Sequence, residues 1–195
     1  MGQRSQIYVK YEENLIVANY YQWNYAERMI SRARSIVEYC MDRLQYDWTF
    51  KEHTSIEKLR RFCDINFDMR DVVTSTNIFK EYEEAVQEGW TEPGTFNDYG
   101  IKHQDNNDGQ LFIHITGGII KYAFASYEGY DKVLTPSGYM EWDERKDWDT
   151  PTEYFDEEDI EICRNNIKFL EEHAVLMTVE ELNDFVNGDY EQKPF

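Results

Sequence analysis

The first 48 residues combine a short alternating pattern with a longer helical one. Apolar and polar residues alternate from Gln6 to Tyr11, a polar turn follows, and a second apolar run extends from Leu15 to Tyr21. This arrangement predicts a β-hairpin. Asn24 then precedes Glu27 by three residues, a spacing typical of a helix start, so we expect a helix over about residues 25–48.

Two further helices are expected in the middle of the chain. Thr54 and Glu57 have the spacing of a capping box and precede a short apolar stripe that ends at Cys63. Another stripe predicts a helix from Asn77 to Glu88, which the glycine at position 89 ends.

Residues 99–142 have the period of strands. Strands are expected at Tyr99 to Gln104, Gln110 to Thr116 and Ile119 to Ser126, with a weaker one at Gly138 to Trp142. The second and third are joined by Gly117-Gly118, a dipeptide typical of a tight hairpin turn. We interpret the segment as an antiparallel meander.

Two helices close the chain and complete the predicted fold. The first is expected from Glu157 to His173, and the second begins at a capping box formed by Thr178 and Glu181. We therefore predict an α+β fold with an antiparallel sheet of five to six strands and about five helices packed mainly on one face. With 195 residues and no linker-like segment, we expect a single domain over 1–195.

Charge changes this picture because it is distributed unevenly. The net charge is -19, yet residues 1–70 carry 11 basic and 10 acidic side chains, so the acidic excess is confined to 71–195. Residues 141–161 alone hold 11 acids and two bases. Such a field repels nucleic acid and membrane surfaces and attracts basic partners. We expect no direct nucleic-acid or membrane binding and, without a secretion signal, a cytoplasmic protein.

Aromatic residues lie among these carboxylates. Spaced acids can imitate the phosphates of a nucleic acid, and aromatic side chains supply much of the affinity of an interface. The alternative is a solvated acidic surface that keeps the protein soluble. The candidate partner-binding residues are Trp142, Asp143, Glu144, Asp147, Trp148, Asp149, Glu153, Tyr154, Asp156, Glu157, Glu158 and Asp159.

No catalytic, cofactor or metal motif stands out. The three cysteines are distant from one another and lie on apolar stripes, so we expect them in the core. The histidines lack metal-binding spacing, and only His103 and His114 are candidates for a pair that meander strands could bring together. We predict no metal site, no cofactor and no catalytic residues, and an enzyme using this histidine pair and nearby carboxylates remains an alternative.

The N-terminus resembles a family of small phage and bacterial proteins without an established activity. Those proteins open with M-G-T-R-S, a strand pair and a Q-[WF]-D-G-Y-P turn into a helix. Here Met1-Gly2-Gln3-Arg4-Ser5 and Tyr21-Gln22-Trp23-Asn24-Tyr25 occupy the matching places, over about the first 45 residues. The resemblance implies a phage or prophage setting, in which small acidic proteins act as counter-defence factors, anti-CRISPR proteins among them.

The leading hypothesis is a non-enzymatic inhibitor that mimics nucleic acid and binds a basic nucleic-acid-binding protein, such as a CRISPR effector. Two alternatives to this hypothesis stand: the enzyme described above, and a module that self-associates into a homo-oligomer. In that module, basic helix faces would meet an acidic surface of a neighbouring copy. These faces carry Arg28, Arg32, Arg60 and Arg61.

Overall fold

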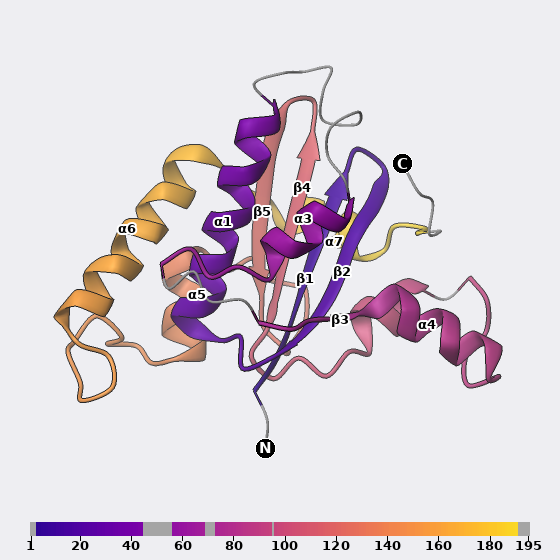
Figure 1. The fold of residues 1–195 in the computed structure, drawn as a ribbon, viewed down its shortest axis with the longest axis horizontal. Coiled ribbons are helices and arrows are strands. Elements are labelled where there is room, and N and C mark those ends of the chain that lie inside the picture. The colour runs from indigo at the N-terminus through magenta and orange to yellow at the C-terminus, as the bar shows by residue number, and fades with distance from the viewer. Residues whose placement is uncertain (1–2, 45–55, 69–72, 95, 191–195) are drawn as a thin grey trace.

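A computed structural model describes residues 3–44, 56–68, 73–94 and 96–190. These residues form an α+β fold around one six-stranded sheet (Figure 1). The strands are β1 (Arg4–Tyr11), β2 (Asn14–Gln22), β3 (Thr76–Asn77), β4 (Gln110–Thr116), β5 (Ile119–Ala125) and β6 (Val175–Leu176). The helices are α1 (Ala26–Leu44), α3 (Ile56–Cys63), α4 (Ile78–Gln87), the π-helix η1 (Asp98–Lys102), α5 (Pro136–Asp143), α6 (Glu157–His173) and α7 (Val179–Val186).

The sheet is mixed, so the predicted all-antiparallel arrangement is wrong. Its strand order is β3-β2-β1-β4-β5-β6, and the two hairpins β1–β2 and β4–β5 are antiparallel. They join side by side through the parallel pair β1 and β4, and β6 pairs parallel with β5. A parallel pair requires a long connection, which residues 23–109 provide between the hairpins.

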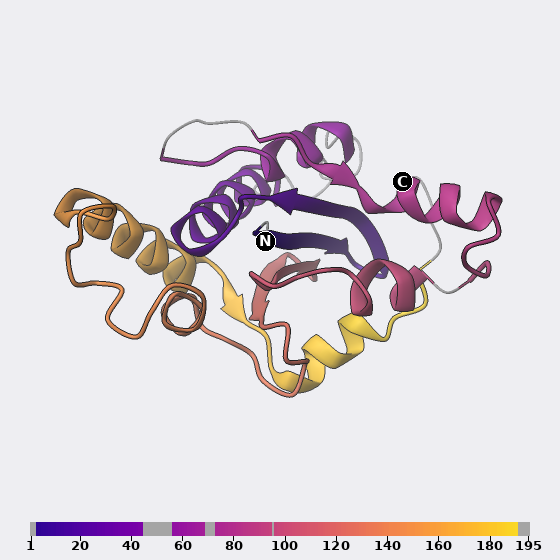
Figure 2. The same cartoon turned by 90° about the horizontal axis from the view of Figure 1, so that it is seen from below.

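Helices cover both faces of the sheet, whereas the sequence favoured one face (Figure 2). One core contains Ile7 and Val9 of β1 with apolar residues of α1, α3, α5 and α6. The other contains Tyr8 of β1 with residues of α4, η1 and α7. Because a central strand is buried on both sides, β1 has six consecutive buried residues, among them polar Ser5, Gln6 and Lys10.

Most short-range predictions are confirmed. Gly117 and Gly118 have φ angles of 54° and 75°, the left-handed conformations that the tight β4–β5 turn requires. Helix α6 has the predicted bounds, and the Thr178–Glu181 capping box opens α7. Asn77 caps α4 by accepting from the Phe79 amide.

Three local predictions need correction or lie outside the described residues. The Asn24 side chain does not cap α1 but donates to Ser5 Oγ, and the Ala26 amide donates to Asp143 Oδ2 instead. Thr54, the expected cap of α3, lies outside the described residues, as do residues 45–48 of the first expected helix.

Two predicted strands are helices. The expected strand at residues 138–142 is α5, because Thr135 Oγ1 accepts from the Gly138 amide and Pro136 occupies the first turn. The expected strand at residues 99–104 is mainly η1. There Gly100 fits against the ring of Phe96, where an added Cβ would lie 2.7 Å from ring atoms. Short apolar runs do not distinguish strand from helix by their period alone.

Candidate functional site

The acidic segment connects α5 to α6 and is almost entirely exposed. Ten of the 11 carboxylates in residues 141–161 are exposed, and the eleventh, Asp143, is partly buried. Residues 144–156 lie between the end of α5 and the start of α6 (Figure 1). The sequence therefore places a dense negative charge at one end of the α1–α6 layer.

Two aromatic side chains fix this segment to the core. Trp148 is 7% exposed and Phe155 is 9% exposed, and both belong to the core that α1 and α6 share. Trp148 was predicted as an anchor for a partner, but its side chain is packed inside the protein and is not available at the surface. It serves instead to hold the carboxylates on either side of it in place.

Arg145 crosslinks the same segment from within. Its guanidinium donates to the carbonyl oxygens of Trp148 and Thr150. It also lies within 4.0 Å of carboxylate oxygens of Glu144 and Asp147. A planar guanidinium with several donors can tie several backbone and side-chain groups together, so Arg145 stiffens residues 144–150.

The start of α6 uses two of the candidate acids as caps. Asp156 Oδ1 accepts from the amides of Glu158 and Asp159 at 2.8 and 3.1 Å, and Asp159 Oδ2 accepts from the Asp156 amide at 3.2 Å. Both carboxylates stay exposed. These two acids, placed at the positive end of the helix dipole, therefore stabilise the helix as well as contributing to the surface charge.

The remaining candidate aromatics differ in exposure. Tyr154 is 89% exposed. Trp142 is partly buried and packs against Tyr127 and Tyr139, with ring centroids 5.7 and 5.9 Å away. Tyr154 is therefore the candidate aromatic with most of its surface available to a partner, and Trp142 lies at the margin.

Asp143 has a structural environment that the sequence did not indicate. Its Oδ2 accepts from the Ala26 amide at 2.6 Å, at the start of α1, and lies 3.0 Å from the Tyr139 hydroxyl. Burial, with repulsion from Asp108 and Glu144, raises the pKa of Asp143 to about 7, against the hydrogen bonds that lower it. We therefore leave Asp143 out of the proposed surface.

A small hollow opens beside Tyr154. It has a volume of about 220 Å³ and lies between the start of α1, residues 66–68 and the first turns of α6. A buried network supports it: Ser31 donates to Asn66 at 2.5 Å, and Asn166 donates to Asp68 at 2.6 Å. Its acidic lining residues are Glu27, Asp68 and Asp159.

The two candidate histidines are not brought together. His103 follows η1 and its Nδ1 lies 2.7 Å from the carbonyl oxygen of Asp98. His114 lies on β4, four residues beyond Gln110, whose side chain contacts η1 through the Ile101 carbonyl. Four residues of strand span about 13 Å, so His103 cannot act with His114.

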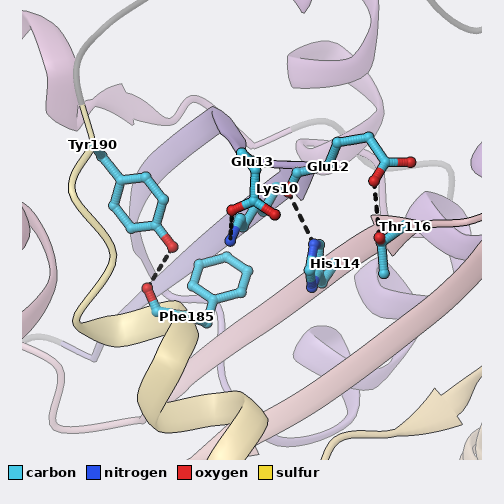
Figure 3. Close-up of polar contacts among 7 residues, drawn as sticks. All are labelled: Lys10, Glu12, Glu13, His114, Thr116, Phe185 and Tyr190. Atoms are coloured by element: carbon cyan, nitrogen blue, oxygen red, sulfur yellow. Dashed lines mark hydrogen bonds and ion pairs between the residues drawn. The ribbon is translucent and has the colours of Figure 1, made fainter.

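His114 instead belongs to a polar cluster at the turn of the first hairpin (Figure 3). It is the register partner of Lys10, and its Nε2 donates to the Glu12 carbonyl oxygen at 2.9 Å. Lys10 Nζ lies 3.3 Å from Glu13 and about 6 Å from the rings of Phe185 and Tyr190. Burial lowers the pKa of His114. No local sequence pattern indicates this cluster, because its members come from β1 and its turn, from β4 and from residues 185–190.

The three cysteines lie where the sequence predicts, whereas one arginine of the expected basic faces does not. Cys40, Cys63 and Cys163 are free and buried, as predicted. Arg32, expected on an outer basic face, is 1% exposed and lies over the Tyr21 ring, so it cannot contribute to such a face.

In the described part of the chain, no three His, Cys, Asp or Glu side chains gather closely enough to hold a metal ion. Within those same residues, no helix combines the length and apolar character that crossing a membrane requires. No protein-family model matches the chain, and neither a curated protein nor a solved structure matches it.

Proposed function

We propose that the protein is a non-enzymatic, phage-type inhibitor that binds a basic nucleic-acid-binding protein and competes with its nucleic acid. Binding would use the acidic face, which we define as Glu144, Asp147, Asp149, Glu153, Tyr154, Asp156, Glu157, Glu158 and Asp159. All of these residues are exposed. The N-terminal resemblance to small phage proteins supports the setting, in which a CRISPR effector would be the target.

The observation that carries this proposal is the fixation of the acidic segment by Trp148, Phe155 and Arg145. A segment needed for solubility alone gains nothing from being held in one conformation. A segment that imitates phosphates does, because ordering it beforehand removes part of the entropic cost of binding. The negative field would also accelerate encounter with a basic partner, at a rate that falls as salt rises.

The test neutralises four carboxylates that the fold does not use. Among the described residues, Glu141, Glu153, Glu157 and Glu158 form no ion pair, and their side chains form no cap. A Gln variant at all four positions should therefore fold like the wild type, apart from a small loss of favourable helix-dipole interaction at the start of α6. Its matched control carries four Gln substitutions on exposed acids of α4, its C-cap and α7. The control positions are Glu83, Glu84, Glu88 and Glu180.

Both variants and the wild type would be used as bait in a bacterial lysate at about 50 and 500 mM salt, with bound proteins identified by mass spectrometry. We expect the wild type and the control to retain a basic nucleic-acid-binding protein at low salt and release it at high salt. The four-Gln variant of the acidic segment should lose it. The purified partner should then lose its nucleic acid when the wild-type protein is added. Equal capture by both variants would show that net charge, and not this face, attracts the partner, and would refute the proposal.

A further inference from the structure

A groove follows α1, bounded on its other side by α3, residues 65–68 and the first turns of α6. Helices α1 and α6 lie side by side in both views (Figures 1 and 2). It consists of the 220 Å³ hollow beside Tyr154 and a wider one of about 780 Å³ farther along α1. The two hollows share Asp68 and Ile162 in their linings. The wide end therefore continues from the edge of the acidic face.

The wide end has an aromatic floor. Tyr39 of α1 and Phe62 of α3 are stacked, with ring centroids 4.1 Å apart, and Phe67 lies beneath the Arg34 guanidinium at 3.8 Å. Arg43 lies 5.1 Å from the Tyr39 ring. A hollow of this size, mainly apolar with a few polar groups, has the dimensions of a ligand or side-chain pocket.

Two buried hydroxyl groups line this floor without partners. Ser35 and Tyr39 are each 5% exposed, and neither hydroxyl forms a hydrogen bond within the described residues. Buried hydroxyls in proteins are almost always paired, because an unpaired one loses its hydration without compensation. A polar group of a ligand that reaches the floor would supply the missing partner.

The charges around the groove favour a cationic occupant. At the wide end, the lining contains Glu38, Asp42 and Asp68 beside Arg43, and a second arginine, Arg34, lies over the Phe67 ring, so acids still outnumber bases. At the narrow end, Glu27 and Asp159 join Asp68 around Arg28, which lies 3.8 Å from Glu27. Tyr154 stands at the mouth with its ring exposed, placed to stack on a guanidinium.

We infer that this groove receives an extended segment of the partner in which an aromatic or large apolar side chain adjoins arginine or lysine. The apolar side chain would fill the wide end over Tyr39 and Phe67, and a neighbouring cation would enter the narrow end beside Asp159 and Tyr154. The inference deepens the proposed function, on which it rests, by naming where specificity would arise. The acidic face attracts any basic surface, whereas the groove selects one sequence feature of it.

The probe is a fluorescein-labelled peptide, Arg-Arg-Trp-Arg-Arg, followed by anisotropy and by amide NMR of the protein. Two control peptides replace the Trp by Gly or all the Arg by Glu. When the Trp peptide is added, we expect the largest changes in the protein's amide chemical shifts at Ser35, Tyr39, Phe67 and Ile162. We expect at least a fivefold weaker affinity for the Gly peptide and no binding of the Glu peptide. Absence of binding, or shifts confined to residues 144–159, would overturn the inference.

Two protein variants test the groove itself. The double variant Glu38→Lys with Asp42→Lys reverses two exposed charges at the rim of the groove. It should lower the affinity for the Trp peptide at least tenfold. The matched control, Glu83→Lys with Glu88→Lys, has the same net charge, at α4 and its C-cap, and should weaken binding less than threefold. Equal weakening in the two charge-reversal variants would refute a groove site.

Tyr39→Phe removes one unpaired hydroxyl and keeps the ring, so it should leave the fold intact. If that hydroxyl bonds the peptide, the affinity should fall about threefold to tenfold. Unchanged affinity would show that the hydroxyl takes no part in binding and would remove it from the inference.

The same variants separate failure of the groove from failure of the proposed function. If the rim variant retains the lysate partner and its inhibition while the four-Gln variant of the acidic segment loses them, the groove inference is wrong and the function stands. If neither variant changes partner capture, the acidic face is not the interface and both are wrong. Loss of the partner in the rim variant, but not in its α4 control, supports the groove.

Discussion

Asp143 offers a test of the structure that is independent of any partner. Its carboxyl group is held between the start of α1 and Tyr139, where burial raises its pKa from 3.8 to about 7. The unfolded chain releases this proton near pH 4, while the folded protein keeps it until about pH 7. The folded state therefore binds more protons in this window, and the free energy of unfolding falls as pH rises through it.

The size of the effect follows from the width of the window. An interval of about three pKa units corresponds to about 4 kcal/mol of stability that is present below pH 4 and lost by pH 7 to 8. Asp143→Asn removes the titrating group and keeps an oxygen that can accept from the Ala26 amide. The variant should therefore match the wild type near pH 4 and exceed its stability by up to about 4 kcal/mol at pH 8.

The assay is urea unfolding of both proteins at one-unit steps from pH 4 to pH 8, followed by circular dichroism. The difference between the variant and the wild type cancels the titration of all other groups. Asp143→Ala is the matched control, because it also lacks the hydrogen-bond acceptor. It should be less stable than Asp143→Asn by about 1 to 2 kcal/mol at every pH. A difference between Asn and wild type that stays constant over the range would refute the argument from burial.

Four further outcomes are expected. Gly118→Ala, at a φ of 75°, should lose about 1 to 2 kcal/mol in urea unfolding, and a loss below 0.5 kcal/mol would contradict the turn geometry. Thr178→Ala should cost about 1 kcal/mol by removing the cap of α7, with Thr178→Ser retaining most of it. In a pH titration by NMR, His114 should titrate below 6.5, and a higher value would contradict its burial. With Arg32 buried, sedimentation should show a monomer at low salt; salt-reversible oligomers would favour the assembly alternative.

Short-range patterns predicted the elements whose signals lie within about ten residues. The period of α6, the glycine turn between β4 and β5, and the Thr178–Glu181 capping box depend on neighbouring side chains, and each is present in the structure. Helix α5 also had a local signal, since Thr135 followed by Pro136 marks a helix start. The prediction of a strand there did not use this signal.

Long-range arrangement was beyond what one sequence offers. The parallel pairing of β1 with β4 joins residues more than 100 positions apart, and no local pattern encodes it. That pairing determines that β1 is central and that helices cover both faces. It also brings Lys10 beside His114, a contact that motif spacing could not reveal.

The acidic segment shows the same limit at the level of single side chains. A run of acids and aromatics cannot reveal which aromatic faces inward, and the structure places Trp148 in the core and Tyr154 in solvent. It also cannot separate carboxylates that stabilise the fold from those that do not. Asp143 accepts a hydrogen bond from a backbone amide at the start of α1, and Asp156 and Asp159 form the capping box at the start of α6.

This division of roles bears on why the segment is acidic. Asp149 pairs with Arg164 at 3.1 Å, so it too has a structural role. Glu153, Glu157 and Glu158 have no such partner among the described residues. Glu153 nevertheless lies two residues before the buried Phe155, and Glu157 and Glu158 lie in the first turn of α6. Carboxylates kept close together repel one another, and the helix dipole at the start of α6 offsets only part of this cost for Glu157 and Glu158. A cationic partner that neutralises these carboxylates would remove the remaining repulsion between them. Their positions therefore argue for binding more strongly than their number does.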